Sequence, residues 1–91
     1  MITKEEAKEI TKNYIEERGR DYININEPYL EKNKEIAFGK YETQKRDIYK
    51  VCYEDEGYDR PDLYFITIEA YTGEVLYTSS EHGYVELMEE D

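Results

Sequence analysis

Side chains that could perform covalent chemistry are scarce in this sequence, which contains one histidine, His82, and one cysteine, Cys52. They are the one pair of residues in the sequence that could act as a thiol nucleophile and an imidazole base. The alternating pattern around Cys52, however, predicts a position in the middle of a strand, where a thiol is usually buried and unreactive. Ser79 and Ser80 lie close to His82 but lack the glycine pattern of a nucleophile elbow, which indicates polar turn residues. We therefore predict that the chain is not an enzyme and has no catalytic residues.

Motifs for cofactors and metals are missing from the sequence as well. The five glycines lie far apart, so they form no glycine-rich loop that could cradle a phosphate. The acidic segment 54–62 invites comparison with a calcium loop, but if Gly57 takes the sixth position of an EF-hand loop, the first position falls on Cys52. A single cysteine also excludes an intramolecular disulfide and a cysteine metal cluster. We therefore expect no metal site and no bound cofactor.

The pattern that most favours a function is a run of carboxylates interleaved with tyrosines between residues 53 and 64. Tyrosine offers a large contact area at a small entropic cost, and carboxylates around it suit a basic partner protein. The alternative is a solvated connection between two strands, with tyrosines present for their β-propensity. The candidate partner-binding residues are Tyr53, Glu54, Asp55, Glu56, Tyr58, Asp59, Asp62 and Tyr64.

The net charge of −11 is confined to one part of the chain. Residues 1–50 contain 11 Lys or Arg and 11 Asp or Glu, whereas residues 51–91 contain one basic residue, Arg60, and 12 acidic ones. Such an acidic surface repels nucleic acid and anionic lipid, so we expect neither as a ligand, and it attracts basic proteins. The alternative reading is that the acidity maintains solubility.

The first element expected is an amphipathic helix over residues 4–18. Thr3 has the type and position of an N-cap, with Glu6 three residues later as its capping-box partner. Gly19 follows the helix and suits a left-handed C-cap. Apolar side chains recur at helical spacing and form a single stripe, which consists of Ala7, Ile10, Tyr14 and Ile15.

The rest of the chain carries the alternation and turn residues of an antiparallel sheet. The strongest strand patterns cover residues 47–54, 63–71 and 74–79, with a tight turn at Thr72-Gly73. In the first of these strands, the alternation places Tyr49, Val51 and Tyr53 on one face. Weaker patterns predict an edge strand at 22–29 that contains Pro28, a charged turn at 31–35, a strand at 35–42 with Gly39 as a bulge, and one helical turn at 84–89, before a frayed end at 89–91.

These elements predict a single α+β domain spanning residues 1–91, in which the N-terminal helix packs on one face of a mostly antiparallel sheet of four or five strands. The other face of that sheet is expected to be either solvated or a contact surface. No apolar run approaches ~18 residues, so we predict no membrane span. The charged start of the chain does not resemble a secretory signal, and we therefore expect either a cytoplasmic protein or a mature fragment.

Two segments resemble known families. Residues 2–10 (ITKEEAKEI) are similar to the opening helix of PepSY-type domains and of small bacterial immunity proteins of the YrhB type. Residues 65–76 (FITIEAYTGEVL) resemble the PepSY hairpin with its Thr-Gly-Glu-Val turn, and the immunity family has a comparable strand, turn and strand. The PepSY resemblance implies a regulatory module that binds a peptidase. The immunity resemblance implies a small cytoplasmic protein that plugs a cognate toxin.

The function that combines these features is that of a cytoplasmic immunity or inhibitor protein. It would neutralise a basic protein, such as a nuclease-type toxin, by occluding it after charge-steered docking. Two alternatives stay open: a PepSY-like regulatory module that binds a peptidase, and a homo-oligomeric structural or interaction protein whose tyrosine-bearing sheet face pairs with a second copy.

Overall fold

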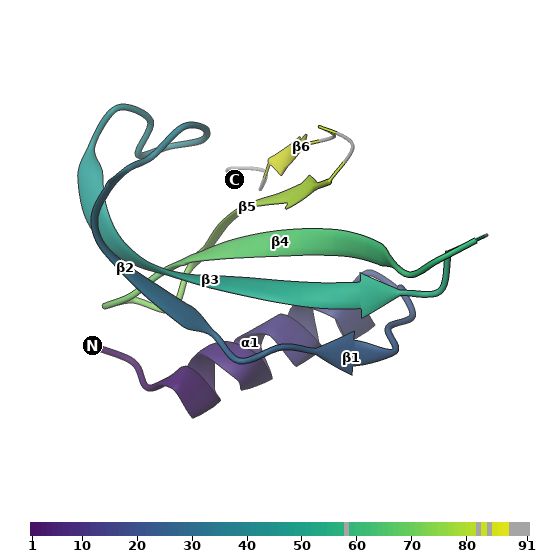
Figure 1. Ribbon diagram of the computed structural model, residues 1–91. Helices are drawn as coiled ribbons and strands as arrows, with labels where there is room; N and C mark the ends of the chain where they lie inside the picture. The colour runs from purple at the N-terminus through teal and green to yellow at the C-terminus, as the bar shows by residue number, and fades with distance from the viewer. Residues whose placement is uncertain (58, 82, 84, 88–91) are drawn as a thin grey trace.

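The computed structural model describes residues 1–57, 59–81, 83 and 85–87, and it consists of one helix packed on a six-stranded sheet (Figure 1). The sheet order is β1-β3-β4-β5-β6, with β2 also paired to β3, and every pairing is antiparallel. The predicted α+β class is confirmed, with six strands where four or five were expected. The elements are α1 (Lys4–Glu17), β1 (Asn24–Ile25), β2 (Tyr29–Glu35), β3 (Lys45–Asp55), β4 (Asp62–Glu69), β5 (Val75–Ser80) and β6 (Val85–Leu87).

Helix α1 begins and ends as its sequence predicts, to within one residue. The Glu6 backbone N–H donates to Thr3 Oγ1 at 3.1 Å, and the Thr3 backbone N–H donates to Glu6 Oε1 at 3.0 Å, which completes a capping box. After the helix, Gly19 takes a left-handed conformation with a φ of 64°. The expected apolar stripe is buried at Ala7 and Ile15, which are both 0% exposed.

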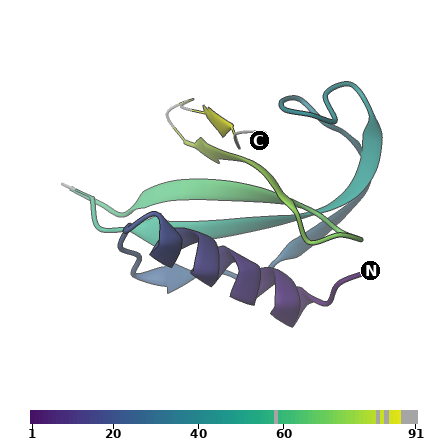
Figure 2. The ribbon, with the colours of Figure 1, turned by 180° about the vertical axis from the view of Figure 1, so that it is seen from behind.

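Helix α1 lies across one face of the sheet, as Figure 2 shows from behind, and the main core is formed by side chains between the two. Tyr49, Val51 and Tyr53 of β3 face the helix, as their alternation predicts. The paired strand β4 contributes Ile66 and Ile68, and both are fully buried. Burial of this apolar area against α1 is the main stabilising contribution that the helix receives.

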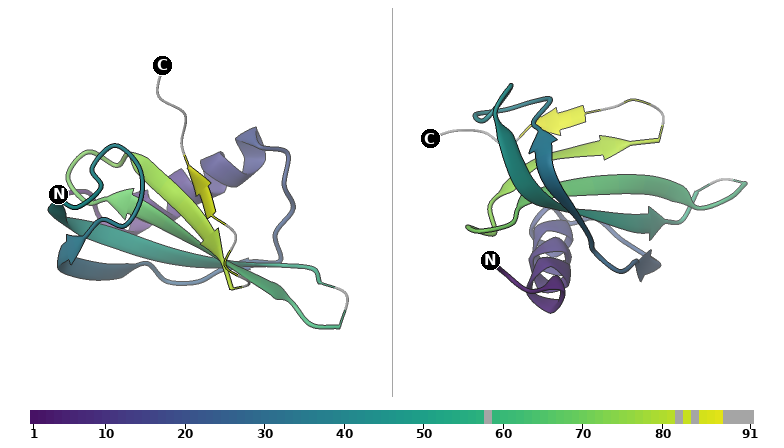
Figure 3. Two further views of the ribbon diagram at one scale, coloured as in Figure 1. Left: turned by 90° about the horizontal axis from the view of Figure 1, so that it is seen from above. Right: turned by 60° about the vertical axis from the view of Figure 1, so that its left-hand side comes forward.

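The opposite face of the sheet is covered at one end by the segment 36–44, which curls over it in Figures 1 and 3. Ile36 from this segment is 1% exposed and packs with Ile48, Leu76 and Tyr77 in a second, smaller core. The Phe38 ring meets the Tyr77 ring edge to face, with a centroid distance of 5.3 Å. This end of the second face is therefore neither solvated nor open to a partner.

Of three weaker predictions between residues 22 and 42, one is confirmed in part and two are wrong. The expected short edge strand at 22–29 is present as β1, which lies at the sheet edge but covers only Asn24–Ile25 and ends before Pro28. The expected charged turn 31–35 is part of β2, an edge strand whose Lys and Glu side chains are mostly exposed. The expected strand 35–42 is largely a turn: β2 ends at Glu35, and the Glu42 N–H donates to the carbonyl of Gly39, whose φ is 93°.

The C-terminal prediction of a helical turn is also wrong where the structure can test it. Residues 85–87 form strand β6, which pairs with β5 from Tyr77↔Leu87 to Ser79↔Val85. Residues 84, 88 and 89 of the expected turn, and the expected frayed end 89–91, lie outside the described residues. Within the part of the chain that the structure describes, no helix is both long enough and apolar enough to cross a membrane.

The docking of α1 gives a stability test with three substitutions. We expect Ile15→Ala to lower the free energy of unfolding by roughly 2–5 kcal/mol, because it leaves a cavity in the main core. Thr3→Ala removes the cap and should cost about 1 kcal/mol. Lys12→Ala, on the exposed face of the same helix, is the control and should have little effect. Urea unfolding measures all three, and equally small losses would mean that the helix is not docked on the sheet.

Candidate functional site

The β3–β4 hairpin places the predicted binding residues at one end of the molecule. Its strands pair without a register shift from Ile48↔Glu69 to Asp55↔Asp62, and the hairpin extends past the C-terminal end of α1 (Figure 1). Five predicted carboxylates gather at this end, and we call them the acidic tip. The acidic tip consists of Glu54, Asp55, Glu56, Asp59 and Asp62.

The acidic tip is exposed at Glu56 and Asp59 and half-buried at its other three members. Asp55 and Asp62 lie directly opposite each other on β3 and β4. Two like charges in this position repel each other and destabilise the pairing of the strands. Arg60, the one basic residue of the C-terminal 41, forms an ion pair with Glu81 at 3.7 Å. The Arg60 guanidinium thus pairs with a carboxylate that directly follows β5 in the chain.

Gly57 fixes the conformation of the hairpin end. A Cβ atom at this position would lie 2.0 Å from the Arg60 carbonyl oxygen and 3.2 Å from Cγ of Asp62. No side chain fits in that space without movement of the backbone. Glycine is therefore required here for close packing, and the packing holds the two arms of the tip together.

The two predicted tyrosines on this hairpin lie under the tip, side by side. The Tyr53 and Tyr64 rings stack with a centroid distance of 5.1 Å and an interplanar angle of 18°. Tyr53 is 1% exposed and belongs to the main core, so its ring is not available for a surface contact, whereas Tyr64 is half-buried. Tyr58, the remaining predicted residue, lies outside the described residues.

A polar network that the sequence does not reveal lies beside these tyrosines and centres on Glu86 of β6. Glu86 Oε1 accepts a hydrogen bond from the Tyr14 hydroxyl at 3.1 Å and forms an ion pair with the Arg18 guanidinium at 2.7 Å. Its other carboxylate oxygen, Oε2, pairs with the Arg20 guanidinium. The Thr78 hydroxyl donates to Tyr14 Oη at 3.0 Å. The network therefore joins the end of α1 to β5 and β6.

The charges in this network determine its pKa shifts. Burial alone would raise the pKa of Glu86, but the hydrogen bond and positive charge of Arg20 outweigh it, and the pKa of Glu86 is lowered. Burial raises the pKa of the Tyr14 hydroxyl, which therefore stays protonated and can donate to Glu86. The β5–β6 register places Thr78 opposite Glu86 and thus sets up the whole arrangement.

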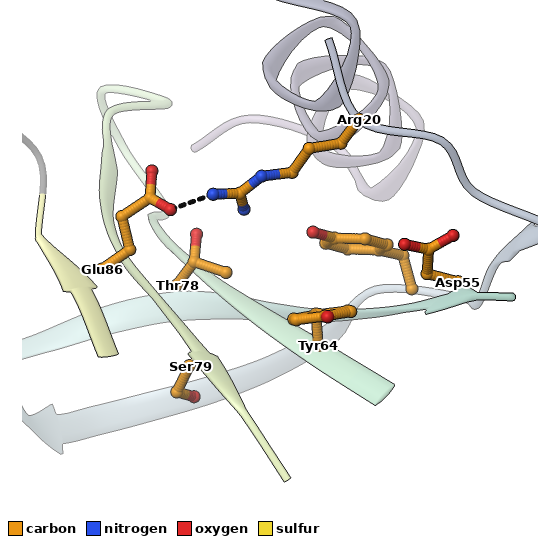
Figure 4. A pocket seen from close by; sticks show the side chains of 7 residues that line it. Arg20, Asp55, Tyr64, Thr78, Ser79 and Glu86 are labelled. Carbon is orange, nitrogen blue, oxygen red and sulfur yellow. Dashed lines mark hydrogen bonds and ion pairs between the residues drawn. The ribbon is translucent and has the colours of Figure 1, made fainter. Parts of the chain in front are cut away.

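A cleft of about 270 Å³ opens between this network and the acidic tip (Figure 4). Its wall draws on the segment after α1 and on four strands, and Asp55 belongs to both the wall and the acidic tip. Figure 4 shows Glu86 and Asp55 at opposite ends, with Arg20 reaching in between them. The lining residues are Arg20, Tyr53, Asp55, Tyr64, Thr78, Ser79 and Glu86.

Cys52 is half-buried in the middle of β3, and burial is the largest cause that raises the pKa of its thiol. A raised pKa lowers the fraction of thiolate, which is the nucleophilic form. His82, the imidazole that could pair with it, lies outside the described residues. Among residues 1–57, 59–81, 83 and 85–87, no group of three or more His, Cys, Asp or Glu side chains is arranged to hold a metal ion.

The Glu86 network gives a pH-dependent stability test. Because the pKa of Glu86 is lower in the folded state, its contribution is present above the unfolded pKa of about 4.3 and is lost as the pH falls through the folded value. We expect Glu86→Gln to cost roughly 1–3 kcal/mol near pH 7 and to flatten the decline in stability below about pH 5. Urea unfolding at several pH values measures both effects.

The matched control is Glu27→Gln, because Glu27 pairs with Lys8 at 3.4 Å on the exposed surface. We expect it to change stability by less than about 0.5 kcal/mol at neutral pH. If Glu86→Gln behaves like this control at every pH, the ion pairs of Arg18 and Arg20 with Glu86 contribute nothing measurable.

Comparisons of the chain with protein-family models, with curated proteins and with solved structures find no match. The acidic tip, the two stacked tyrosines and the cleft are therefore interpreted on their own chemistry, and the resemblances of residues 2–10 and 65–76 stay predictions.

Proposed function

We propose that this protein is a cytoplasmic immunity or inhibitor protein that binds a basic protein, such as a nuclease-type toxin, and occludes it. The observation that carries the proposal is the placement of five carboxylates at the projecting end of the β3–β4 hairpin. Arg60, the basic residue closest in sequence, is paired with Glu81 instead. A concentrated negative surface of this kind steers a basic partner into encounter and orients it.

Binding proceeds in two physical stages in this proposal. The acidic tip acts at long range and raises the rate of association, with a reach of about 8–10 Å at physiological salt. Contact then forms around the hairpin end, where half-buried Tyr64 supplies aromatic area next to Asp62. Tyr53 contributes from below as a rigid support, because it is buried and stacked on Tyr64.

The experiment requires the partner, which a pull-down from the native host followed by mass spectrometry identifies. The test variant carries Glu54→Gln, Glu56→Gln and Asp59→Asn. Asp55 is left unchanged because it also lines the cleft. We expect association at low salt to slow by about ten-fold, with a flatter dependence on salt, while dissociation changes little. Surface plasmon resonance at two salt concentrations measures these rates.

The matched control carries Glu9→Gln, Glu16→Gln and Glu17→Gln, three exposed residues on α1. It changes the net charge by the same amount but leaves the acidic tip intact. If both variants slow association equally, overall charge steers the encounter and the tip has no special role. If neither has an effect and affinity is indifferent to salt, the proposal of charge-steered binding through the tip fails.

A further inference from the structure

Among the described residues, no group accepts the proton of the buried Tyr53 hydroxyl, although the Arg20 guanidinium interacts with its oxygen. The residue is 1% exposed, and its side chain lines the cleft beside Arg20. Burial raises the pKa of this hydroxyl and the nearby Arg20 only partly offsets the rise, so the group is protonated and able to donate. Buried hydroxyl groups are nearly always bonded in folded proteins, so an exception that faces a cleft requires an explanation.

The other polar groups at the inner end of the cleft are already engaged. Glu86 accepts from three donors, and the hydroxyls of Tyr14 and Thr78 are bonded to each other. Arg20 bonds Glu86 through one nitrogen, and a guanidinium has five N–H donors, which leaves donors available to a second acceptor. This end of the cleft therefore offers hydrogen-bond donors, from Arg20 and Tyr53, to anything that enters it.

The other end of the cleft offers an acceptor. The Glu56 backbone N–H donates to Asp55 Oδ1 at 2.7 Å, which leaves the other carboxylate oxygen, as far as the described residues go, able to accept from a donor. Figure 4 shows Asp55 at the end of the cleft away from Glu86, with Tyr64 between them along the floor. The cleft thus presents donors at one end, an acceptor at the other and an aromatic side chain between them.

We propose that the cleft binds a neutral planar amide group, with its carbonyl oxygen toward Tyr53 and Arg20, its N–H toward Asp55 and its plane against Tyr64. A guanidinium or amidinium has donors alone and would meet Arg20. A carboxylate has acceptors alone and would meet Asp55 in a chain of net charge −11. An amide satisfies both ends and adds no charge. Two sources have this chemistry: an Asn or Gln side chain of a protein partner, and a free small-molecule amide.

Three probes of the same shape test the proposal: benzamide, benzamidine and benzoate. They present, in that order, a donor with an acceptor, donors alone and acceptors alone. We expect benzamide to bind most tightly, with a Kd of about 1 mM, and to shift the backbone amide NMR signals of Arg20, Asp55 and Tyr64. Preference for benzamidine or benzoate, or no shift with benzamide at about 10 mM, would overturn the proposal.

Tyr53→Phe tests the hydroxyl directly, because it removes one oxygen and keeps the stacked ring. We expect it to weaken benzamide binding about five-fold, while thermal stability is unchanged or higher, since no group among the described residues accepts the hydroxyl proton. Tyr71→Phe is the control, because Tyr71 is exposed and its hydroxyl bonds Asp47 at 3.3 Å. Unchanged benzamide affinity in Tyr53→Phe, or a loss of stability with it, would mean that the hydroxyl serves the fold alone.

A competition experiment between benzamide and the captured partner protein identifies the source of the amide. If benzamide displaces the captured partner, the partner inserts an Asn or Gln side chain. If both bind together, the amide belongs to a separate small molecule. This proposal does not rest on the inhibitor function, because the probes need no partner and the tip variant keeps Asp55. Salt-dependent partner binding without benzamide binding would contradict the amide site and leave the acidic tip's role intact.

Discussion

One strand, β3, sets the geometry on which the rest of the structure depends. It pairs with β4 through eight consecutive residues and with β1 and β2 along its other edge. Its register directs Tyr49, Val51 and Tyr53 into the main core, and a slip by one residue would turn all three to the opposite face. The same ladder continues past α1 and carries Asp55 opposite Asp62. Packing against the helix therefore also fixes where the charged end of the molecule lies.

The elements that could be predicted from the sequence are those with a strong local period or an adjacent signal. Helix α1, its capping box and strands β3 to β5 are of this kind, and so are the tip carboxylates, which are neighbours in the chain. Strand β2 was missed because its run of Lys and Glu has no apolar alternation and is held in the sheet by pairing with β3. The Glu86 network was missed because Arg20 and Glu86 lie 66 residues apart and no local pattern links them.

The structure explains where the charges of the balanced N-terminal part and of the acidic C-terminal part lie. Basic residues pair with several carboxylates of the acidic part away from the tip. Lys40 pairs with Glu74, and Arg18 and Arg20 pair with Glu86. Arg46 approaches Glu69 at 4.0 Å. The pairs of Glu86 hold the end of α1 against β6, and the pair of Lys40 with Glu74 holds the segment 36–44 beside the start of β5. In the described residues the excess negative charge is therefore concentrated at the hairpin end. The charges that pair α1 and the segment 36–44 with the C-terminal strands thus lie away from the acidic tip.

Glu86 also imposes an order on how the protein can be completed during synthesis. The donors on and after α1 leave the ribosome early, but the carboxylate that they share is made 66 residues after Arg20. Until then Tyr14, Arg18 and Arg20 must bond water, and the end of α1 gains its ion pairs only after β6 has paired with β5. The carboxylate and its donors therefore meet only once the chain from α1 to β6 has folded.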